Sequence, residues 1–148
     1  MDLIKYPETN YNSWLDEDEA IEYFESRILT DSKWDACAQK EAALMTAFRS
    51  LAELNLDITF DDDKVISATH YTTTEAADIL TALQQASCEQ ALHELMNDLD
   101  SPPITSMTVG GMVSAKIPDK FAKPARFSQR TLSILRPYII AKVVSRTR

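Results

Sequence analysis

Apolar residues between Trp34 and Asn55 recur at the spacing of one helix face. They lie three, four or seven positions apart, at Cys37, Leu44, Ala47, Phe48, Leu51 and Leu54. The charged residues Lys40, Glu41, Arg49 and Glu53 lie off this stripe, so the pattern predicts an amphipathic helix over 34–55. A stripe this wide needs other helices against it. We therefore expect a mainly α fold, a small bundle of three to five helices.

Capping signals indicate where two further helices begin. Asp16 followed by Glu19 has the spacing of a capping box and predicts a helix that runs to about Leu29. Near the end of the chain, Ser128 can cap a last helix, which Pro137 then ends or kinks.

The longest expected helix begins either at Thr72, where Glu75 completes a second capping box, or with Thr74 as its cap, and can run to Asn97 or Leu99. Its apolar residues form two stripes: Ala76, Ile79, Leu80 and Leu83, and then Cys88, Ala91, Leu92, Leu95 and Leu99. At 100° per residue the centres of the two stripes differ by roughly 140°. Either the helix breaks within 84–87, or its halves pack on different partners and the second half faces a neighbouring subunit.

Residues 105–117 alternate between apolar and polar types on both sides of Gly110-Gly111. Two glycines between alternating runs are typical of a hairpin turn. A long unpaired arm with a glycine hinge is an equal alternative for this extended segment.

Charge divides the chain sharply in two. Residues 1–103 carry 22 acidic and 6 basic side chains, a balance of −16, whereas residues 104–148 carry 1 acidic and 9 basic side chains, a balance of +8. At 148 residues the chain is expected to form one domain, with an acidic helical body over 1–103 and a basic extension over 104–148. Such asymmetry is typical of an interaction surface.

The chain ends in an apolar, β-branched run with cationic residues, which is unusual for a free monomer. We expect this tail to bind a partner through Tyr138, Ile139, Ile140, Lys142, Val143, Val144, Arg146 and Arg148. A subunit interface is expected to use the second stripe of the long helix and the remaining cations of the extension. Its predicted residues are Leu92, Leu95, Leu99, Lys116, Lys120, Lys123, Arg126 and Arg130.

No pattern in the sequence indicates catalysis, a cofactor or a metal site, so we expect a protein that is not an enzyme. Its only glycines are adjacent, which excludes the P-loop and dinucleotide fingerprints. His70 and His93 lack metal-ligand spacing with either cysteine. The acidic run 61–63 lacks the glycine and the closing glutamate of an EF-hand loop, and is expected to be solvated.

The two cysteines and the hydropathy indicate the environment of the chain. Cys37 and Cys88 are isolated and are expected to be reduced, buried thiols. There is no apolar run of about eighteen residues, so no membrane span is expected. The first ten residues do not resemble a secretory signal.

Three segments, in chain order, resemble the small head–tail connector proteins of tailed phages, also called adaptor or head-completion proteins. They are Asn12-Ser13-Trp14 with residues 18–27, Trp34 with residues 39–47, and residues 109–114 with residues 132–139. Part of this group is labelled as DnaT-like single-stranded-DNA-binding proteins. Family members often carry a glycine- and proline-rich loop between the second and third helices. Here residues 58–73 are acidic and contain neither residue.

The resemblance implies a structural protein of the virion neck, assembled in the bacterial host cytoplasm. It implies a homo-oligomeric ring, commonly a homododecamer, that docks on the portal protein and extends the channel for double-stranded DNA. The ring offers a platform for neck or tail proteins, and the C-terminal segment reaches to the portal. An acidic body suits a conduit, because carboxylates do not bind phosphate as a wall of cations would.

The alternative from a different class is a single-stranded-DNA-binding accessory protein of replication. Such a protein needs a basic groove with exposed aromatic side chains on which bases stack. The basic extension offers Phe121, Phe127 and Tyr138 for this, and the acidic body would repel a strand.

Overall fold

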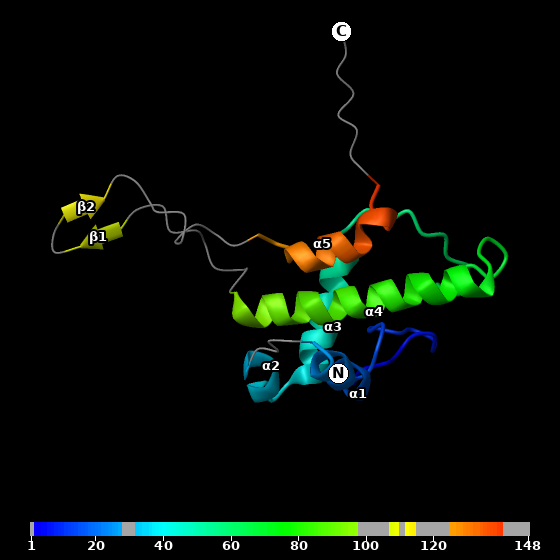
Figure 1. Cartoon of the computed structure of the whole chain (residues 1–148), viewed down its shortest axis with the longest axis horizontal. Helices are drawn as coiled ribbons and strands as arrows, with labels where there is room; N and C mark the ends of the chain where they lie inside the picture. The colour runs from blue at the N-terminus through cyan, green and yellow to red at the C-terminus, as the bar shows by residue number, and fades with distance from the viewer. Residues whose placement is uncertain (1, 28–31, 98–106, 110–111, 115–124, 141–148) are drawn as a thin grey trace, which may run out of the picture.

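The computed structural model describes residues 2–27, 32–97, 107–109, 112–114 and 125–140, and shows the mainly α fold expected from the sequence (Figure 1). The helices within these ranges are α1 (Glu17–Glu25), α2 (Ser32–Ala36), α3 (Lys40–Leu51), α4 (Thr73–Met96), α5 (Gln129–Leu135) and the 3₁₀ helix η2 (Arg136–Tyr138). A two-stranded sheet is formed by β1 (Met107–Val109) and β2 (Met112–Ser114). None of the described helices is long and apolar enough to cross a bilayer.

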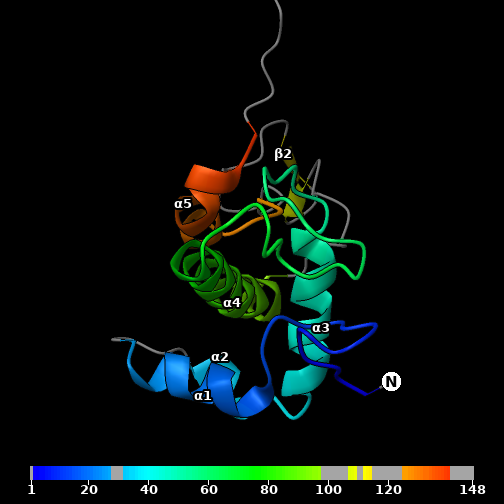
Figure 2. The same cartoon turned by 90° about the vertical axis from the view of Figure 1, so that its right-hand side faces the viewer.

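Helix α4 is the axis of the bundle, and α1, α2, α3 and α5 all contact it. Figures 1 and 2 show α5 on one side of α4, α1 and α2 on the opposite side, and α3 crossing along a third. The core is therefore built around α4, where Leu83, Ala86 and Cys88 are completely buried.

The two predicted capping boxes are confirmed, at the starts of α1 and α4. The Asp16 carboxylate accepts a hydrogen bond from the Glu19 amide at 2.9 Å, and the Glu19 carboxylate accepts one from the Asp16 amide at 3.2 Å. The same reciprocal pair joins Thr72 and Glu75 at the start of α4, at 3.1 and 3.3 Å. Each box satisfies backbone donors that a helix start leaves without an internal partner.

The single helix predicted over 34–55 is wrong, because α2 and α3 are separate helices with 37–39 between them. In a continuous helix, Trp34 would lie roughly 80° from Leu44 around the axis, so the two side chains would point in different directions. The break lets Trp34 turn toward α1, where its ring lies 4.7 Å from that of Phe24. Leu44 meanwhile stays buried in the core.

Helix α4 is continuous, and the hypothesis that its second half faces a neighbouring subunit is wrong. Ile79 and Leu92, one from each stripe, are both buried, and Leu80 and Leu95 are half-buried against the same core. Both stripes find partners within one chain because other helices surround α4 on several sides. Leu92, only 5% exposed, is thus a core residue rather than a free subunit contact.

The segment around the two glycines forms a hairpin rather than an unpaired arm. β1 and β2 are antiparallel, and Val109 lies opposite Met112, which leaves two residues for the turn. This is the loop length that the glycine pair predicts.

Candidate partner-docking surface

Helix α5 is the part of the basic extension that is built into the body. Ser128 caps it as predicted, and its hydroxyl accepts a hydrogen bond from the Thr131 amide at 2.9 Å. Thr131 and Leu135 are completely buried, whereas Leu132, at the edge of this buried face, is 38% exposed. The buried face packs on α4, so α5 positions everything that follows it.

A buried glutamine fixes the backbone that leads into α5. The Gln90 side chain of α4 donates a hydrogen bond to the Arg126 carbonyl at 2.9 Å and accepts one from the Ser128 amide at 3.1 Å. Beside it, the His93 Nε2 atom lies 2.6 Å from the Ala125 carbonyl oxygen. Sequence reasoning missed this clamp. The available signal was a polar Gln90 one turn along from the apolar Ala86, on the buried side of the helix.

The root of the C-terminal tail, residues 138–140, runs antiparallel to the segment that follows α3. The Asp57 amide donates to the Tyr138 carbonyl at 2.5 Å, and the Ile140 amide donates to the Asn55 carbonyl at 2.8 Å. Between these bonds, Ile139 pairs with Leu56. The tail root, which begins at the end of η2, is therefore held to the body by one β-bridge and two backbone hydrogen bonds.

The predicted partner-binding residues divide into two groups at this root. Tyr138 and Ile139 are half-buried against the core of their own chain, so they serve the body as well as any partner. Ile140 is 44% exposed. The remaining predicted residues lie outside the described part of the chain: Lys142, Val143, Val144, Arg146 and Arg148.

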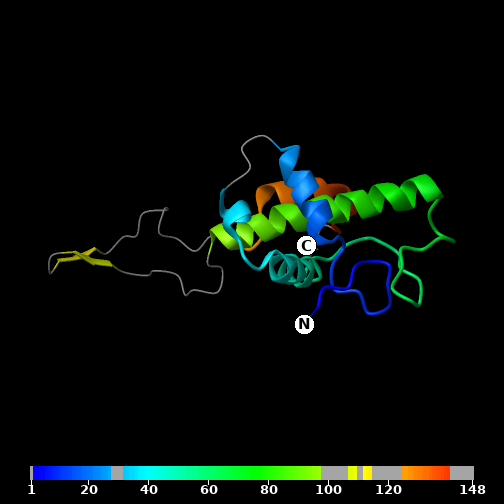
Figure 3. The same cartoon turned by 90° about the horizontal axis from the view of Figure 1, so that it is seen from below.

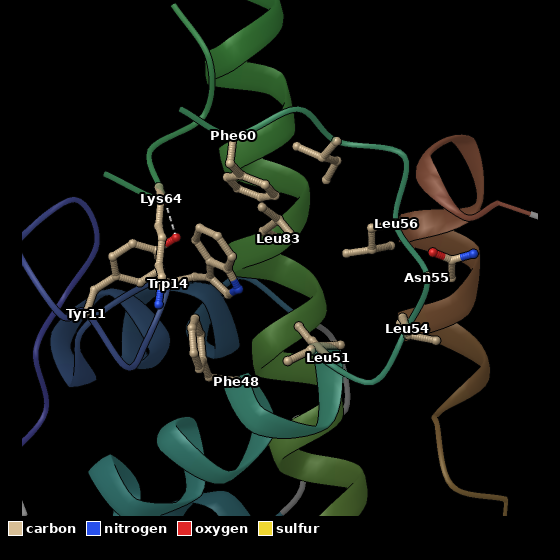
Figure 4. Close-up of a pocket in the computed structure, with 12 residues that line it drawn as sticks. Tyr11, Trp14, Phe48, Leu51, Leu54, Asn55, Leu56, Phe60, Lys64 and Leu83 are labelled. Carbon is tan, nitrogen blue, oxygen red and sulfur yellow. Dashed lines mark hydrogen bonds between the residues drawn. The ribbon is translucent and has the colours of Figure 1, made fainter. Parts of the chain in front are cut away.

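An open, largely apolar cleft of about 410 Å³ lies beside the tail root (Figure 4). We call it the aromatic cleft, and it is lined by Tyr11, Trp14, Phe48, Leu51, Ala52, Leu54, Asn55, Leu56, Ile58, Phe60, Lys64 and Leu83. The ring centroid of Trp14 lies 5.5 Å from that of Phe48 and 6.2 Å from that of Phe60, which is 39% exposed. The N-terminal arm supplies Tyr11 and Trp14, and Figure 3 shows this arm beside the loop between α3 and α4.

The polar groups of the aromatic cleft are arranged at its margin. The Tyr11 hydroxyl donates to the Lys64 carbonyl. Burial, and to a smaller degree Tyr6, raises the pKa of Tyr11 to about 12, so it is a neutral phenol at neutral pH. An adjoining hollow shares Tyr11 and Lys64 with the cleft and adds the carboxylates of Asp62 and Asp63.

The loop that borders the cleft is strongly acidic. Asp57, Asp61, Asp62 and Asp63 are all exposed, and Lys64 is the one basic residue between positions 54 and 64. Within the described ranges no three His, Cys, Asp or Glu side chains are grouped to hold a metal ion. The cleft itself is largely apolar, and Lys64 is its one charged lining residue. The carboxylates of Asp62 and Asp63 line the adjoining hollow, so an apolar cleft lies next to an acidic surface.

A buried carboxylate joins α1 to α4 on the other side of the bundle. Glu89, 3% exposed, accepts a hydrogen bond from the Tyr23 hydroxyl at 2.5 Å and pairs with the Arg27 Nε atom at 3.1 Å. Burial first, and then the hydrogen bond to Glu89, raises the pKa of Tyr23 well above its usual value. Because all three groups are occupied with one another, this contact orients α1.

The two cysteines differ in environment, although neither forms a disulfide. Cys88 is completely buried, and this burial raises the pKa of its thiol, which keeps it protonated and unreactive. Cys37 is only half-buried, so the prediction of two buried thiols is right for Cys88 alone.

The cations predicted at a subunit interface are found in different settings. Arg126 forms a two-bond ion pair with Glu53 of the same chain, at 3.1 and 3.2 Å, so it already joins the extension to the body. Arg130 is exposed on α5. Leu99, Lys116, Lys120 and Lys123 lie outside the described residues.

Comparisons of the chain with protein-family models, with curated proteins and with solved structures gave no match. The tail root, the aromatic cleft and the division of charge are the observations that bear on function.

Proposed function

We propose that the chain is a structural virion protein, a ring-forming head-to-tail adaptor of a tailed phage. In this role it docks on the portal, extends the DNA channel and presents a platform for neck or tail proteins. It performs no chemistry. Its place is the neck of the virion.

The observation that carries the proposal is the way the tail leaves the body. Two backbone hydrogen bonds and the Ile139–Leu56 pair fix its root, and Ile140 is then exposed. Eight residues follow, with valines at 143 and 144 and cations at 142, 146 and 148. An apolar strip with cationic ends, following a hydrogen-bonded root, has the composition of an interface segment.

The charge of the body supports a conduit rather than a nucleic-acid binder. Residues 1–103 carry a balance of −16, and exposed carboxylates occupy α1 and the loop bordering the aromatic cleft. A DNA strand would be repelled by such a surface and could slide past it. Phe127 and Tyr138 of the extension are half-buried, so they are poor stacking platforms for single strands.

Electron microscopy of the purified full chain, alone and mixed with the portal protein of the same phage, tests the proposal. We expect closed rings, or rings that form on the portal and are coaxial with it. A chain that stays monomeric in the presence of portal would contradict the proposal. A tight, salt-sensitive complex with single-stranded DNA and no ring would favour the replication accessory protein instead.

A charge reversal in the tail tests whether the tail itself contacts the portal or whether only the overall charge of the chain matters. We expect Arg146→Glu to weaken portal binding by at least tenfold, since it replaces an attraction by a repulsion at an interface. Arg49→Glu makes the same change at an exposed position on α3 and serves as the matched control. Equal losses in the two variants would show that the tail has no special part in binding.

A further inference from the structure

We infer that, before assembly, the chain's own C-terminal residues 141–148 bind in the aromatic cleft, which we call their seat. The isolated protein would thereby cover its apolar cleft with its apolar tail. This inference concerns the free chain and does not rest on the ring or on the portal.

The position of the tail root makes the seat reachable. Ile140 is bonded to Asn55, and Asn55 and Leu56 themselves line the cleft. The eight residues that follow span up to about 26 Å when extended. A segment that starts at the wall of the cleft therefore has ample length to fold over that wall.

The two surfaces match in chemistry. The cleft offers a floor of Trp14, Phe48 and Phe60 with an exposed ring edge, and Val143-Val144 supply adjacent apolar side chains of the kind that such a floor accepts. The loop 54–64 carries four carboxylates outside the cleft lining and one lysine within it, a balance of −3. Residues 141–148 carry three cations and no acidic side chain. Apolar and charge complementarity thus point to the same segment.

The tether favours the chain's own tail over a foreign peptide of the same composition. Because the root is fixed beside the cleft, the effective concentration of residues 141–148 is in the millimolar range. Even a weak intrinsic affinity then gives substantial occupancy. A partner that captures the tail would at the same time uncover the cleft, so one binding event would expose a second surface.

Paramagnetic relaxation in the full chain tests the seat directly. A nitroxide is attached through Arg148→Cys in a Cys37→Ser background, since the buried Cys88 does not react. We expect the Trp14 indole and Phe60 signals to lose most of their intensity, and the signals of α1 to lose much less. Unchanged intensity at Trp14 and Phe60 would overturn the inference.

Two controls define the contact. Val143→Asn with Val144→Asn should restore the cleft signals, whereas Ser145→Asn, a polar change in the same segment, should leave them broadened. Equal behaviour of the two variants would contradict a seat made by the valines. Phe60→Ser, at an exposed position of the cleft, should also weaken the contact while the fold survives.

Isotope mixing distinguishes the chain's own tail from that of another copy. In the first sample, the chain that carries both the nitroxide and the isotope label is diluted ninefold with unlabelled chain that carries no nitroxide. Its signals should remain broadened. Broadening of an isotope-labelled chain without nitroxide by a nitroxide-bearing unlabelled chain would place the tail in a second copy and overturn the inference.

Discussion

Helix α5 and the tail root adjoin in the basic extension, yet they are held to the body in different ways. α5 inserts the fully buried Leu135 and Thr131 into the core around α4. The root lies along an edge, with two backbone hydrogen bonds and half-buried side chains at Tyr138 and Ile139. The net charge thus changes sign after residue 103, whereas the packed core extends as far as Leu135.

The acidic helical body predicted over 1–103 therefore shares its core with a helix of the basic extension. Leu135 belongs to the same buried cluster as Leu83 and Leu92 of α4. Net charge reports how a surface meets solvent and ions, whereas packing depends on the apolar residues that a segment can bury. A strongly basic segment can therefore supply a core helix.

The largest expected effect comes from the buried face of α5. Leu135→Ala should lower the free energy of unfolding by about 3 kcal/mol, because it removes buried methyl groups and leaves a cavity. Leu132→Ala, at a 38% exposed position of the same helix, should change it by less than about 1 kcal/mol. Urea denaturation monitored by circular dichroism measures both. Similar losses in the two variants would show that α5 is not a core helix.

An intermediate effect is expected from two truncations that bracket the tail root. Deleting residues 138–148 removes two backbone hydrogen bonds and the packing of Tyr138 and Ile139, and should cost about 2 kcal/mol. Deleting 141–148 leaves the root intact and should cost several-fold less, the loss being confined to contacts in the cleft. Thermal unfolding of both proteins compares them. If the shorter deletion is the more damaging, the tail beyond Ile140 is part of the core.

The smallest effect is expected from the ion pair between Arg126 and Glu53, which spans the extension and the body. Both side chains are about half exposed, at 42% and 54%, so the coupling energy should be between about 0.2 and 1 kcal/mol. A double-mutant cycle with Arg126→Ala and Glu53→Ala measures it by urea denaturation. Raising the salt concentration should reduce it further. A coupling that is large and insensitive to salt would mean that the pair is more buried in solution than its exposure indicates.

Local signals in the sequence predicted the helix starts well. Asp16 with Glu19, Thr72 with Glu75, and Ser128 each cap the helix that they indicated. The caps depend on residues three or four positions apart, so a linear pattern contains all the information that they need. The glycine pair left a hairpin and an unpaired arm as equal alternatives, and the pairing of β1 with β2 decides for the hairpin.

Long-range features were missed for the opposite reason. The Gln90 clamp joins positions 36 and 38 residues apart, and the Glu89 contact with Tyr23 spans 66 residues. The aromatic cleft likewise gathers Tyr11, Phe48 and Phe60 from three separate segments. No periodicity along the chain indicates which distant residues will meet.

Composition and local pattern alone were sufficient to establish a mainly α chain, its capped helix starts and its division into acidic and basic parts. Three-dimensional packing decided that described residues of both α4 stripes pack against the core of one chain, that 37–39 separate α2 from α3, and that α5 belongs to the core. The physical reason is that capping and turn energies are local, whereas burial depends on which surfaces the folded chain brings together.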